Sequence, residues 1–238
     1  MFIRADFTKL RPGKPAIQAS FQLNLKHGRI NYLVGPPGSG KRTLFEILLG
    51  RLRPDQGSLT ADGKIWFQGD AGLFVEILDR PVNAVLGGDI LSRHQTVRAI
   101  LSRALSHWPT RTRARRVAVL LDRIAMERSA ECKVLELDLV QRWKLTLARA
   151  LASRPGLLLV DEPFAFLDPG MSERFESDLR LLVREEGASV LISDAGNRPL
   201  GHSGDLLLRI EAGRIYPTAA DQPTEAPELR ISGPGPKA

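Results

Sequence analysis

The sequence predicts an α/β fold with a mostly parallel core sheet, an N-terminal antiparallel β subdomain and a helical insertion. Three observations carry this prediction. A glycine-rich segment joins a strand-like run to a helix-like run near residue 40, and strand-like and helix-like runs alternate again over residues 140–192. Between these two regions, residues 96–126 switch to helical periodicity. Alternating strands and helices imply a mostly parallel sheet that is covered on both faces.

The composition is that of one or two ordinary globular domains. Of the 238 residues, 43% are hydrophobic and 26% are charged, which excludes collagen, a repeat solenoid and wholesale disorder. A single cysteine, Cys132, cannot build a disulfide framework. No apolar stretch approaches the roughly 18 residues that cross a bilayer, and the charged N-terminus is unlike a signal peptide. We therefore expect a cytosolic chain, whose net charge of +7 leaves nucleic acid or anionic lipid open as partners.

The first third of the chain predicts strands and one short helix. Strand-like runs are separated by turn residues and lie at 1–3, 19–25, 29–34, 54–67 and 72–75. The apolar residues of 43–49 have helical spacing, and Gly50 ends that helix.

The remaining two thirds predict helices that enclose two buried strands. Helical spacing covers about 96–126, with Thr110 as an N-cap, and then 140–153 and 171–186. Strands are expected at 157–160 and 189–192, and a last hairpin at 206–216. We therefore expect one folded unit over 1–216, with a helical subdomain at about 92–153. The proline-rich segment 217–238 is expected to be a disordered tail.

The glycine-rich segment predicts a phosphate-binding loop. Gly35-Pro-Pro-Gly-Ser-Gly-Lys41 follows a strand and opens a helix, so that main-chain N–H groups can approach phosphate oxygens closely. Lys41 would reach the β- and γ-phosphates. The pattern breaks at Arg42, where a hydroxyl group should bind Mg²⁺, because a guanidinium cannot coordinate a metal. Thr43 comes one residue late, and its hydroxyl is expected to face the α-phosphate. The expected nucleotide contacts in this loop are Gly35, Pro36, Pro37, Gly38, Ser39, Gly40, Lys41, Arg42 and Thr43.

Two acidic residues end the apolar strand at 157–160. An aspartate at a buried strand end, here Asp161, can hold Mg²⁺ through water, and the adjacent Glu162 can polarise an attacking water molecule. Asp161 is therefore the candidate metal-side residue, and Glu162 is the candidate catalytic residue.

These motifs, in this order and spacing, resemble the nucleotide-binding subunit of an ATP-binding cassette (ABC) transporter. The resemblance runs from residue 1 to about 216 and rests on 35–43, 148–155, 157–163 and 166–168. It implies a P-loop NTPase fold of the ABC type, in which two subunits enclose two ATP molecules. Each site then uses the phosphate loop of one subunit and the signature loop of the other. Lys41, Asp161 and Glu162 match the phosphate-binding lysine, the magnesium-side aspartate and the catalytic glutamate, while Phe166, Leu167 and Asp168 match the loop that crosses the dimer interface.

Several positions depart from the family pattern. Glu76 is expected to replace the glutamine that ends the strand at 72–75, and Asp194, preceded by Ser193, replaces the switch histidine. The signature Leu-Ser-Gly-Gly-Gln reads Leu137-Asp-Leu-Val-Gln141, and Leu10 stands where an aromatic residue stacks on adenine. Glu76 and Asp194 complete the expected nucleotide-contacting set.

These replacements change charge and backbone access at the phosphates. Losing both glycines and the serine of the signature loop removes close approach and a donor, and Asp138 adds an anion. Losing a preorganised donor such as the switch histidine costs roughly 10²–10³-fold in rate. We expect retained or weakened ATP binding and slow or absent hydrolysis. Arg42 is expected to pair with either Glu76 or Asp161, so that nucleotide is held without tightly bound Mg²⁺ or the ion pair plugs the site.

Three functions remain open at this point. The first is an ATP-binding subunit of an ABC-type transport complex, peripheral on the inner face of the cell membrane. Its partners would be an integral membrane transport subunit and a second cassette, identical or different. The second is a non-hydrolysing regulatory or scaffolding cassette that is paired with an active partner. The third is a nucleic-acid-associated ATPase, supported by the arginine cluster at 111–116; we consider nucleic acid the less favoured partner because such clusters are usually solvated helix faces.

Overall fold

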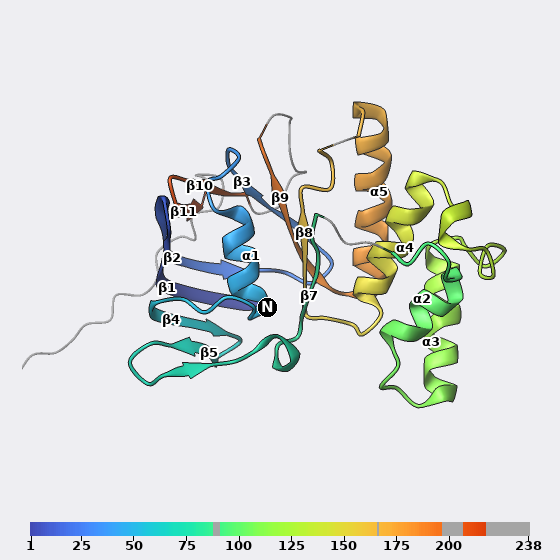
Figure 1. The fold of residues 1–238 in the computed structure, drawn as a ribbon, viewed down its shortest axis with the longest axis horizontal. Helices are drawn as coiled ribbons and strands as arrows, with labels where there is room; N and C mark the ends of the chain where they lie inside the picture. Colours follow the sequence, from blue (N-terminus) through green and yellow to red (C-terminus); the bar gives the residue numbers. More distant parts are fainter. Residues whose placement is uncertain (88–90, 166, 197–206, 218–238) are drawn as a thin grey trace, which may run out of the picture.

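The computed structural model describes residues 1–87, 91–165, 167–196 and 207–217 (Figure 1). The strands are β1 (Phe2–Arg11), β2 (Lys14–Asn24), β3 (Ile30–Val34), β4 (Gln56–Ala61), β5 (Lys64–Gln68), β6 (Leu73–Phe74), β7 (Val82–Val85), β8 (Leu157–Asp161), β9 (Ser189–Asp194), β10 (Leu207–Glu211) and β11 (Arg214–Pro217). The α-helices are α1 (Lys41–Leu49), α2 (Val97–Ala104), α3 (Thr110–Arg123), α4 (Leu139–Leu151) and α5 (Pro169–Glu186). Short 3₁₀ turns cover Ile77–Asp79 and Val134–Glu136.

All described strands form one sheet. Its order is β6-β5-β4-β1-β2-β11-β10-β3-β9-β8-β7. The strands from β6 to β2 pair antiparallel, whereas β10, β3, β9, β8 and β7 run parallel to their neighbours in that series. The predicted fold class, with a mostly parallel core and an antiparallel N-terminal β part, is therefore confirmed.

The burial pattern of the strands explains why the sheet has two cores. Every second residue is buried over 2–7 of β1 and 17–24 of β2, as in a sheet with one covered face, whereas all five residues of β3 are buried. In β8, Leu157 and Leu159 pack with α1, while Leu158 and Val160 pack with the helices of the opposite face. The sheet is thus covered on both faces at its parallel half, as expected from the alternation of strands and helices.

The helices α2, α3 and α4 stand together beside the sheet, with α5 between them and the strands (Figure 1). This arrangement agrees with the helical insertion that the sequence predicts. One detail of that prediction is wrong: Thr110 is the first residue of α3 and Pro109 holds the N-cap position. The side chain that caps a helix in this region is Thr96, whose Oγ1 accepts the N–H of Ala99 at 3.2 Å.

Some predicted features fall outside the described residues. Leu206 of the last hairpin, Phe166 of the expected interface loop and residues 218–238 of the expected tail lie there. Pro217 belongs to β11, which pairs with Leu208 of β10. Within the part of the chain that the structure describes, no helix combines the length and the apolar character needed to cross a lipid bilayer.

Candidate nucleotide-binding site

The glycine-rich loop lies between the end of β3 and the start of α1. The Gly35 N–H donates to the Asp194 carbonyl at 3.1 Å, and the Ser39 N–H donates to the Pro36 carbonyl at 3.2 Å, which closes a turn. Gly38 and Gly40 have φ values of +79° and +120°, a region that side chains disfavour. No side chain caps the N-terminus of α1. The first N–H groups of this helix are therefore available to an anion.

Close packing of the loop leaves one polar atom without a partner. A Cβ on Gly35 would lie 2.3 Å from the Ile210 carbonyl oxygen, and one on Gly40 would lie 2.1 Å from Ile17 Cδ1. Ser39 is 6% exposed, and its Oγ has no hydrogen-bond partner. A buried hydroxyl without a partner is costly, so this atom indicates a missing polar ligand at the loop.

Lys41 has three partners, two in the loop and one after β8. Its Nζ donates to the carbonyl of Gly35 at 2.6 Å and to that of Pro36 at 3.2 Å, and lies 3.1 Å from Glu162 Oε1. The side chain is 5% exposed. An ammonium group offers only three donors, so Lys41 must release one or more of these partners before it can donate to a bound phosphate.

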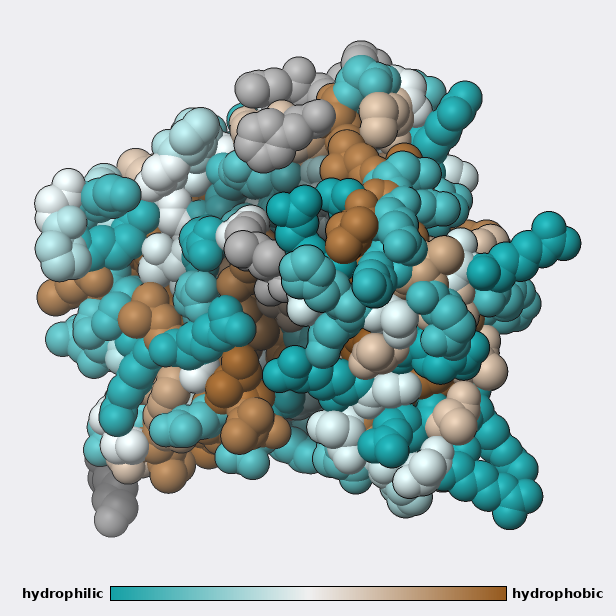
Figure 2. Space-filling model, turned by 45° about the vertical axis from the view of Figure 1, so that its right-hand side comes forward, coloured by the Kyte–Doolittle hydropathy of each residue, from teal (hydrophilic) through white to brown (hydrophobic). Residues whose placement is uncertain are grey.

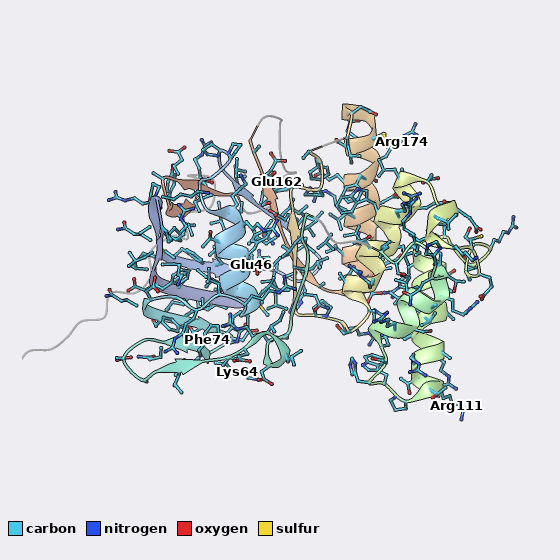
Figure 3. All side chains as sticks on the ribbon, in the orientation of Figure 1. Glu46, Lys64, Phe74, Arg111, Glu162 and Arg174 are labelled. Atoms are coloured by element: carbon cyan, nitrogen blue, oxygen red, sulfur yellow. The ribbon has the colours of Figure 1, made fainter. Side chains whose placement is uncertain are left out.

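Asp161 and Glu162 stand at the carboxyl end of β8 and are held by Ser193 of the neighbouring strand β9. The Ser193 hydroxyl donates to Asp161 Oδ1 at 2.6 Å and accepts the Glu162 N–H at 3.0 Å. Glu162 has φ +46°, a left-handed conformation that is strained for a residue with a side chain. Figure 3 shows Glu162 at the upper end of β8. The buried serine therefore fixes both acidic residues, one through its side chain and the other through its backbone.

Arg42 faces the other oxygen of Asp161. Arg42 Nη1 lies 3.8 Å from Asp161 Oδ2, and the arginine side chain is 59% exposed while that of the aspartate is 11% exposed. The expectation that Arg42 pairs with Asp161 is thus met by geometry. Because the cation is largely solvated, this pair alone adds little to stability.

The alternative pairing of Arg42 with Glu76 is wrong. The Glu76 backbone lies against Gly50, since a Cβ on Gly50 would be 3.0 Å from the Glu76 carbonyl carbon. Gly50 follows the last turn of α1 and Arg42 stands in its first turn, about 12 Å apart at 1.5 Å per residue. Figure 3 shows Phe74, two residues before Glu76, far below Glu162.

A buried arginine explains where Glu76 lies. The Arg80 guanidinium donates to the carbonyls of Ile47 and Leu48 at the end of α1, at 2.7 and 3.0 Å, and to that of Val75 at 2.8 Å. Burial lowers the pKa of Arg80 to about 10, so the group stays charged at neutral pH. Arg80 therefore fixes the segment containing Glu76 at the far end of α1.

Of the two strands that flank β8, β9 was predicted and β7 was missed. β7 pairs parallel with β8, with Val85 opposite Val160. Two residues after β7, a Cβ on Gly87 would lie 4.0 Å from Arg42 Nη1. The segment that enters the acidic end of the site thus follows Val85 instead of Val75. The signal available in the sequence was the short apolar run after Pro81.

The other predicted residues divide into those at the site and those away from it. Asp194 ends β9 beside Gly35, and its Oδ1 accepts the Gly196 N–H at 2.7 Å. Leu10 is 66% exposed. Its neighbour Arg11, which the sequence analysis did not consider, contacts the loop directly: its guanidinium donates to the carbonyls of Gly38 and Ser39.

A cavity of about 540 Å³ joins these residues and is large enough for a nucleotide. Its lining consists of Arg11, Lys14, Pro37, Gly38, Gly40, Lys41, Arg42, Thr43, Glu46, Leu52, Asp161 and Glu162. Four cations, open helix N–H groups and the Ser39 hydroxyl fit a triphosphate. They fit Mg²⁺ poorly, because the Asp161 oxygens face Ser193 and Arg42. Among the described residues no cluster of three metal-binding side chains occurs.

The segment 137–141 caps the N-terminus of α4 with its own side chains. Asp138 is the N-cap of α4; its Oδ1 accepts the Gln141 N–H at 2.8 Å, and its own N–H donates to Gln141 Oε1 at 3.1 Å. This capping box fills positions where a phosphate could bind. Leu139 and Val140 in the first turn are 50% and 42% exposed.

A second cavity, of about 620 Å³, lies between the ends of β7 and β8 and the helical subdomain. Its lining includes Val85, Leu91, Trp143, Glu162 and Leu167. Figure 2 shows apolar surface in a hollow near the middle of one face, bordered by hydrophilic side chains.

Comparison with known proteins gives one consistent result. Residues 19–165 match the family model described as "ABC transporter". The Fe(3+) ions import ATP-binding protein FbpC of Pseudomonas fluorescens is 32% identical over 87% of this chain and 58% of its own length. The molybdenum import ATP-binding protein ModC of Mesorhizobium japonicum is 32% identical over 97% of this chain and 60% of its own length. The chain thus spans about three fifths of the length of these relatives.

Solved structures share the fold at lower identity. The cbiO1 protein of Clostridium perfringens, described as part of the ABC transporter complex cbiONQ, superposes with a TM-score of 0.76 at 22% identity, covering 90% of this chain and 86% of its own. An ATP-binding cassette of an ABC transporter in its ADP conformation gives 0.71 at 18% identity, covering 91% and 89%.

Proposed function

The chain belongs to the ABC transporter family, and from that premise we propose that it is an ATP-binding subunit of a membrane import complex with slow or absent ATP hydrolysis. Its relatives are named as import ATP-binding proteins for different solutes, which supports import. The observation that carries the proposal is the loop from Gly35 to Lys41, with open N–H groups, a buried lysine and the unpartnered Ser39 hydroxyl.

Nucleotide binding in this site rests on main-chain geometry and on cations. The N–H groups at the start of α1 and the helix dipole favour the phosphates, and Lys41 moves from the carbonyls of Gly35 and Pro36 to the phosphate oxygens. Thr43 lies in the same first turn and lines the cavity. These groups leave Asp161 paired with Arg42, so nucleotide is held without Mg²⁺ as an obligatory partner.

Slow hydrolysis follows from how the acidic residues are engaged. Glu162 is the candidate base, yet its carboxylate forms an ion pair with Lys41. Asp194, at the end of β9, supplies negative charge where the family pattern places a donor. Since like charge repels the γ-phosphate in its transition state, Asp194 reduces turnover. The ion pair of Glu162 belongs to the state before nucleotide binds, because Lys41 then moves to the phosphate oxygens.

The proposed partners are an integral membrane transport subunit and a second cassette, at the inner face of the cell membrane. The apolar cavity beside the helical subdomain, lined by Leu91 and Trp143, supports contact with another protein chain. A regulatory cassette that does not hydrolyse ATP is the second candidate, because the capping box at Asp138 occupies the helix end that a partner's nucleotide would need.

The arginine cluster on α3, which suggested a nucleic-acid role, does not form a binding surface in the structure. Arg116 is 4% exposed and pairs with Glu186 inside the protein, so it cannot contact a phosphate backbone. The remaining exposed arginines stand at the start of α3, where Figure 3 shows Arg111 at the edge of the molecule. Arg111 and Arg115 are exposed, whereas Arg113 is half-buried and donates to the Ser106 carbonyl, so these cations are ordinary surface charge.

ATP binding to Lys41→Met tests the proposal, because methionine keeps the aliphatic stem in its buried place. We expect calorimetry to show at least tenfold weaker ATP binding than for the unaltered protein, since a charge-assisted contact to phosphate is lost. Lys64→Ala, an exposed lysine of β5, is the matched control and should leave binding unchanged. We further expect ATP turnover well below about 1 s⁻¹, the low end of ordinary enzymes. Absence of ATP binding, or rapid turnover, would contradict the proposal.

A further inference from the structure

An exposed apolar segment lies between β6 and β7, at the end of α1 that is remote from the phosphate loop. Leu78 is 94% exposed, and no residue of the turn Ile77–Asp79 is buried. Leu73, on the strand β6 at one edge of the sheet, is 50% exposed. Figure 3 shows Phe74 of this strand at the lower edge of the antiparallel half, far from Glu162. The segment 73–79, which we call the edge surface, is therefore separate from the nucleotide cavity.

The turn in the edge surface is anchored on both sides, although none of its own residues is buried. Before the turn, the Val75 N–H donates to the Trp66 carbonyl of β5 at 2.8 Å. After the turn, Cζ of the buried Arg80 lies 4.8 Å from the ring centroid of Trp66 and 5.3 Å from that of Phe74. The same guanidinium bonds the end of α1. A partner that covers Leu78 therefore meets a turn whose two ends are already fixed, which reduces the entropy lost on binding.

The edge surface and the residues just before it carry only negative charge. From residue 69 to residue 79 every charged side chain is acidic, namely Asp70, Glu76 and Asp79. All three residues are exposed, and in the part of the chain that the structure describes none of them forms an ion pair. The whole chain, in contrast, has a net charge of +7. Exposed leucine side chains and unpaired carboxylates thus occur together on this segment.

The sign of these charges distinguishes among possible partners. Nucleic acid and anionic lipid are negatively charged and would be repelled. A second copy of the chain that met this surface across a twofold axis would place each set of acids against the identical set. A protein segment with Lys or Arg beside an apolar side chain complements both the carboxylates and the leucines, because opposite charges favour association.

We propose that the edge surface is a docking site for a positively charged protein segment. Leu78 makes the apolar contact, and Glu76 and Asp79 make the ionic contacts. The inference goes beyond the proposed function, because docking at this surface does not depend on nucleotide binding. It predicts that the charge of a bound segment decides its affinity and that salt weakens the binding.

Fluorescence anisotropy of the full chain with two labelled synthetic peptides tests the inference. One peptide contains leucine and lysine residues spaced by serine, and the other has glutamate in place of every lysine. We expect the lysine peptide to bind tighter by about tenfold or more at low salt. Leu78→Ser should weaken its binding about tenfold, because the apolar contact is lost. Glu76→Gln combined with Asp79→Asn should weaken it about threefold and reduce its salt dependence.

Matched control variants change exposed residues of the same types on other elements. They are Leu181→Ser on α5 and the combination of Asp122→Asn with Glu127→Gln near the end of α3. Both controls should leave peptide binding unchanged.

NMR spectra of the unaltered protein locate the bound peptide without any substitution. The lysine peptide should shift the backbone amide signals of 73–79 and leave those of 35–43 in place. The inference is overturned if the lysine peptide does not bind, if both peptides bind alike, or if the shifted signals lie elsewhere. It is also overturned if the control variants weaken binding as much as Leu78→Ser does.

Discussion

At the scale of single residues, the site is organised by charges that neutralise one another across strand ends. Asp161 lies between the Ser193 hydroxyl and the Arg42 guanidinium, and Glu162 lies beside Lys41. Each acid therefore has a partner on another element before any ligand arrives. These partly exposed pairs add little to stability, but a ligand that binds the cations has to break them.

The buried serine of β9 gives the sharpest test at this scale. Ser193→Ala removes a donor to a carboxylate and an acceptor for the Glu162 N–H, so we expect the free energy of unfolding to fall by about 1.5–3 kcal/mol. Ser189→Ala is the matched control, because this buried serine of the same strand bonds only the neutral Leu25 carbonyl and should cost about 1 kcal/mol. Urea unfolding measures both. An equal or smaller loss for Ser193→Ala would show that the bridge does not stabilise the acidic pair.

Sequence patterns located the residues of local motifs and missed those that meet through the sheet. The loop at Lys41 and the strand end at Asp161 could be predicted, because each motif is continuous along the chain. Arg11 and the role of Ser193 could not, since strand pairing brings them to their partners from 27 or more residues away along the chain. Glu76 was misplaced because two short apolar runs compete for the position next to β8, and only the parallel pairing of β7 decides between them.

At the scale of elements, helix and strand types followed from periodicity, and helix ends did not. The spacing of apolar residues predicted α4 and α5 within about two residues, because their buried faces are continuous. The end of α3 was misjudged by one residue: Thr110 is a good N-cap residue, but Pro109 takes that place and Thr110 begins the helix. The position of a helix cap depends on backbone dihedral angles, and the residue type favours certain angles without fixing them.

The capping box of α4 predicts a measurable effect. Asp138→Ala leaves the first turn without an acceptor and should cost about 1 kcal/mol of unfolding free energy, whereas Asp138→Asn, which can still accept, should cost little. Asp122→Ala is the control, since this exposed acid near the end of α3 opposes the helix dipole and its removal should be neutral or slightly stabilising. Chemical unfolding checks the series. A loss for Asp138→Asn as large as for Asp138→Ala would contradict the cap.

At the scale of the whole molecule, a buried charge cluster ties the helical subdomain to the core. Arg116 of α3 forms a two-pronged contact with Glu186 at the end of α5, and it also donates to the Leu151 and Ala152 carbonyls at the end of α4. Arg123 contacts the same carboxylate. Three helices thus meet at Arg116, whose partner Glu186 has a side chain that is 1% exposed. The contact joins the helical subdomain to α5, which packs on the sheet.

Breaking the cluster should lower the free energy of unfolding strongly. Glu186→Ala leaves two arginines without their shared anion, one of them buried, and should lower the free energy of unfolding by about 3–5 kcal/mol. Glu131→Ala is the matched control, because its ion pair with Arg98 is exposed and should contribute less than about 1 kcal/mol. Thermal and urea unfolding compare the two variants. Similar small losses in both would mean that the buried cluster does not hold the subdomain.

The most direct measurement is ATP affinity with Mg²⁺ and with a chelator, for the unaltered protein and for Arg42→Ser. Because Arg42 occupies the metal side of Asp161, we expect the affinity of the unaltered protein to change by less than about threefold when Mg²⁺ is removed. Arg42→Ser restores a hydroxyl and frees the Asp161 carboxylate, so its ATP binding should become dependent on Mg²⁺. If ATP binding to the unaltered protein depended strongly on Mg²⁺, and Arg42→Ser showed the same dependence, Arg42 would not stand in for the metal beside Asp161.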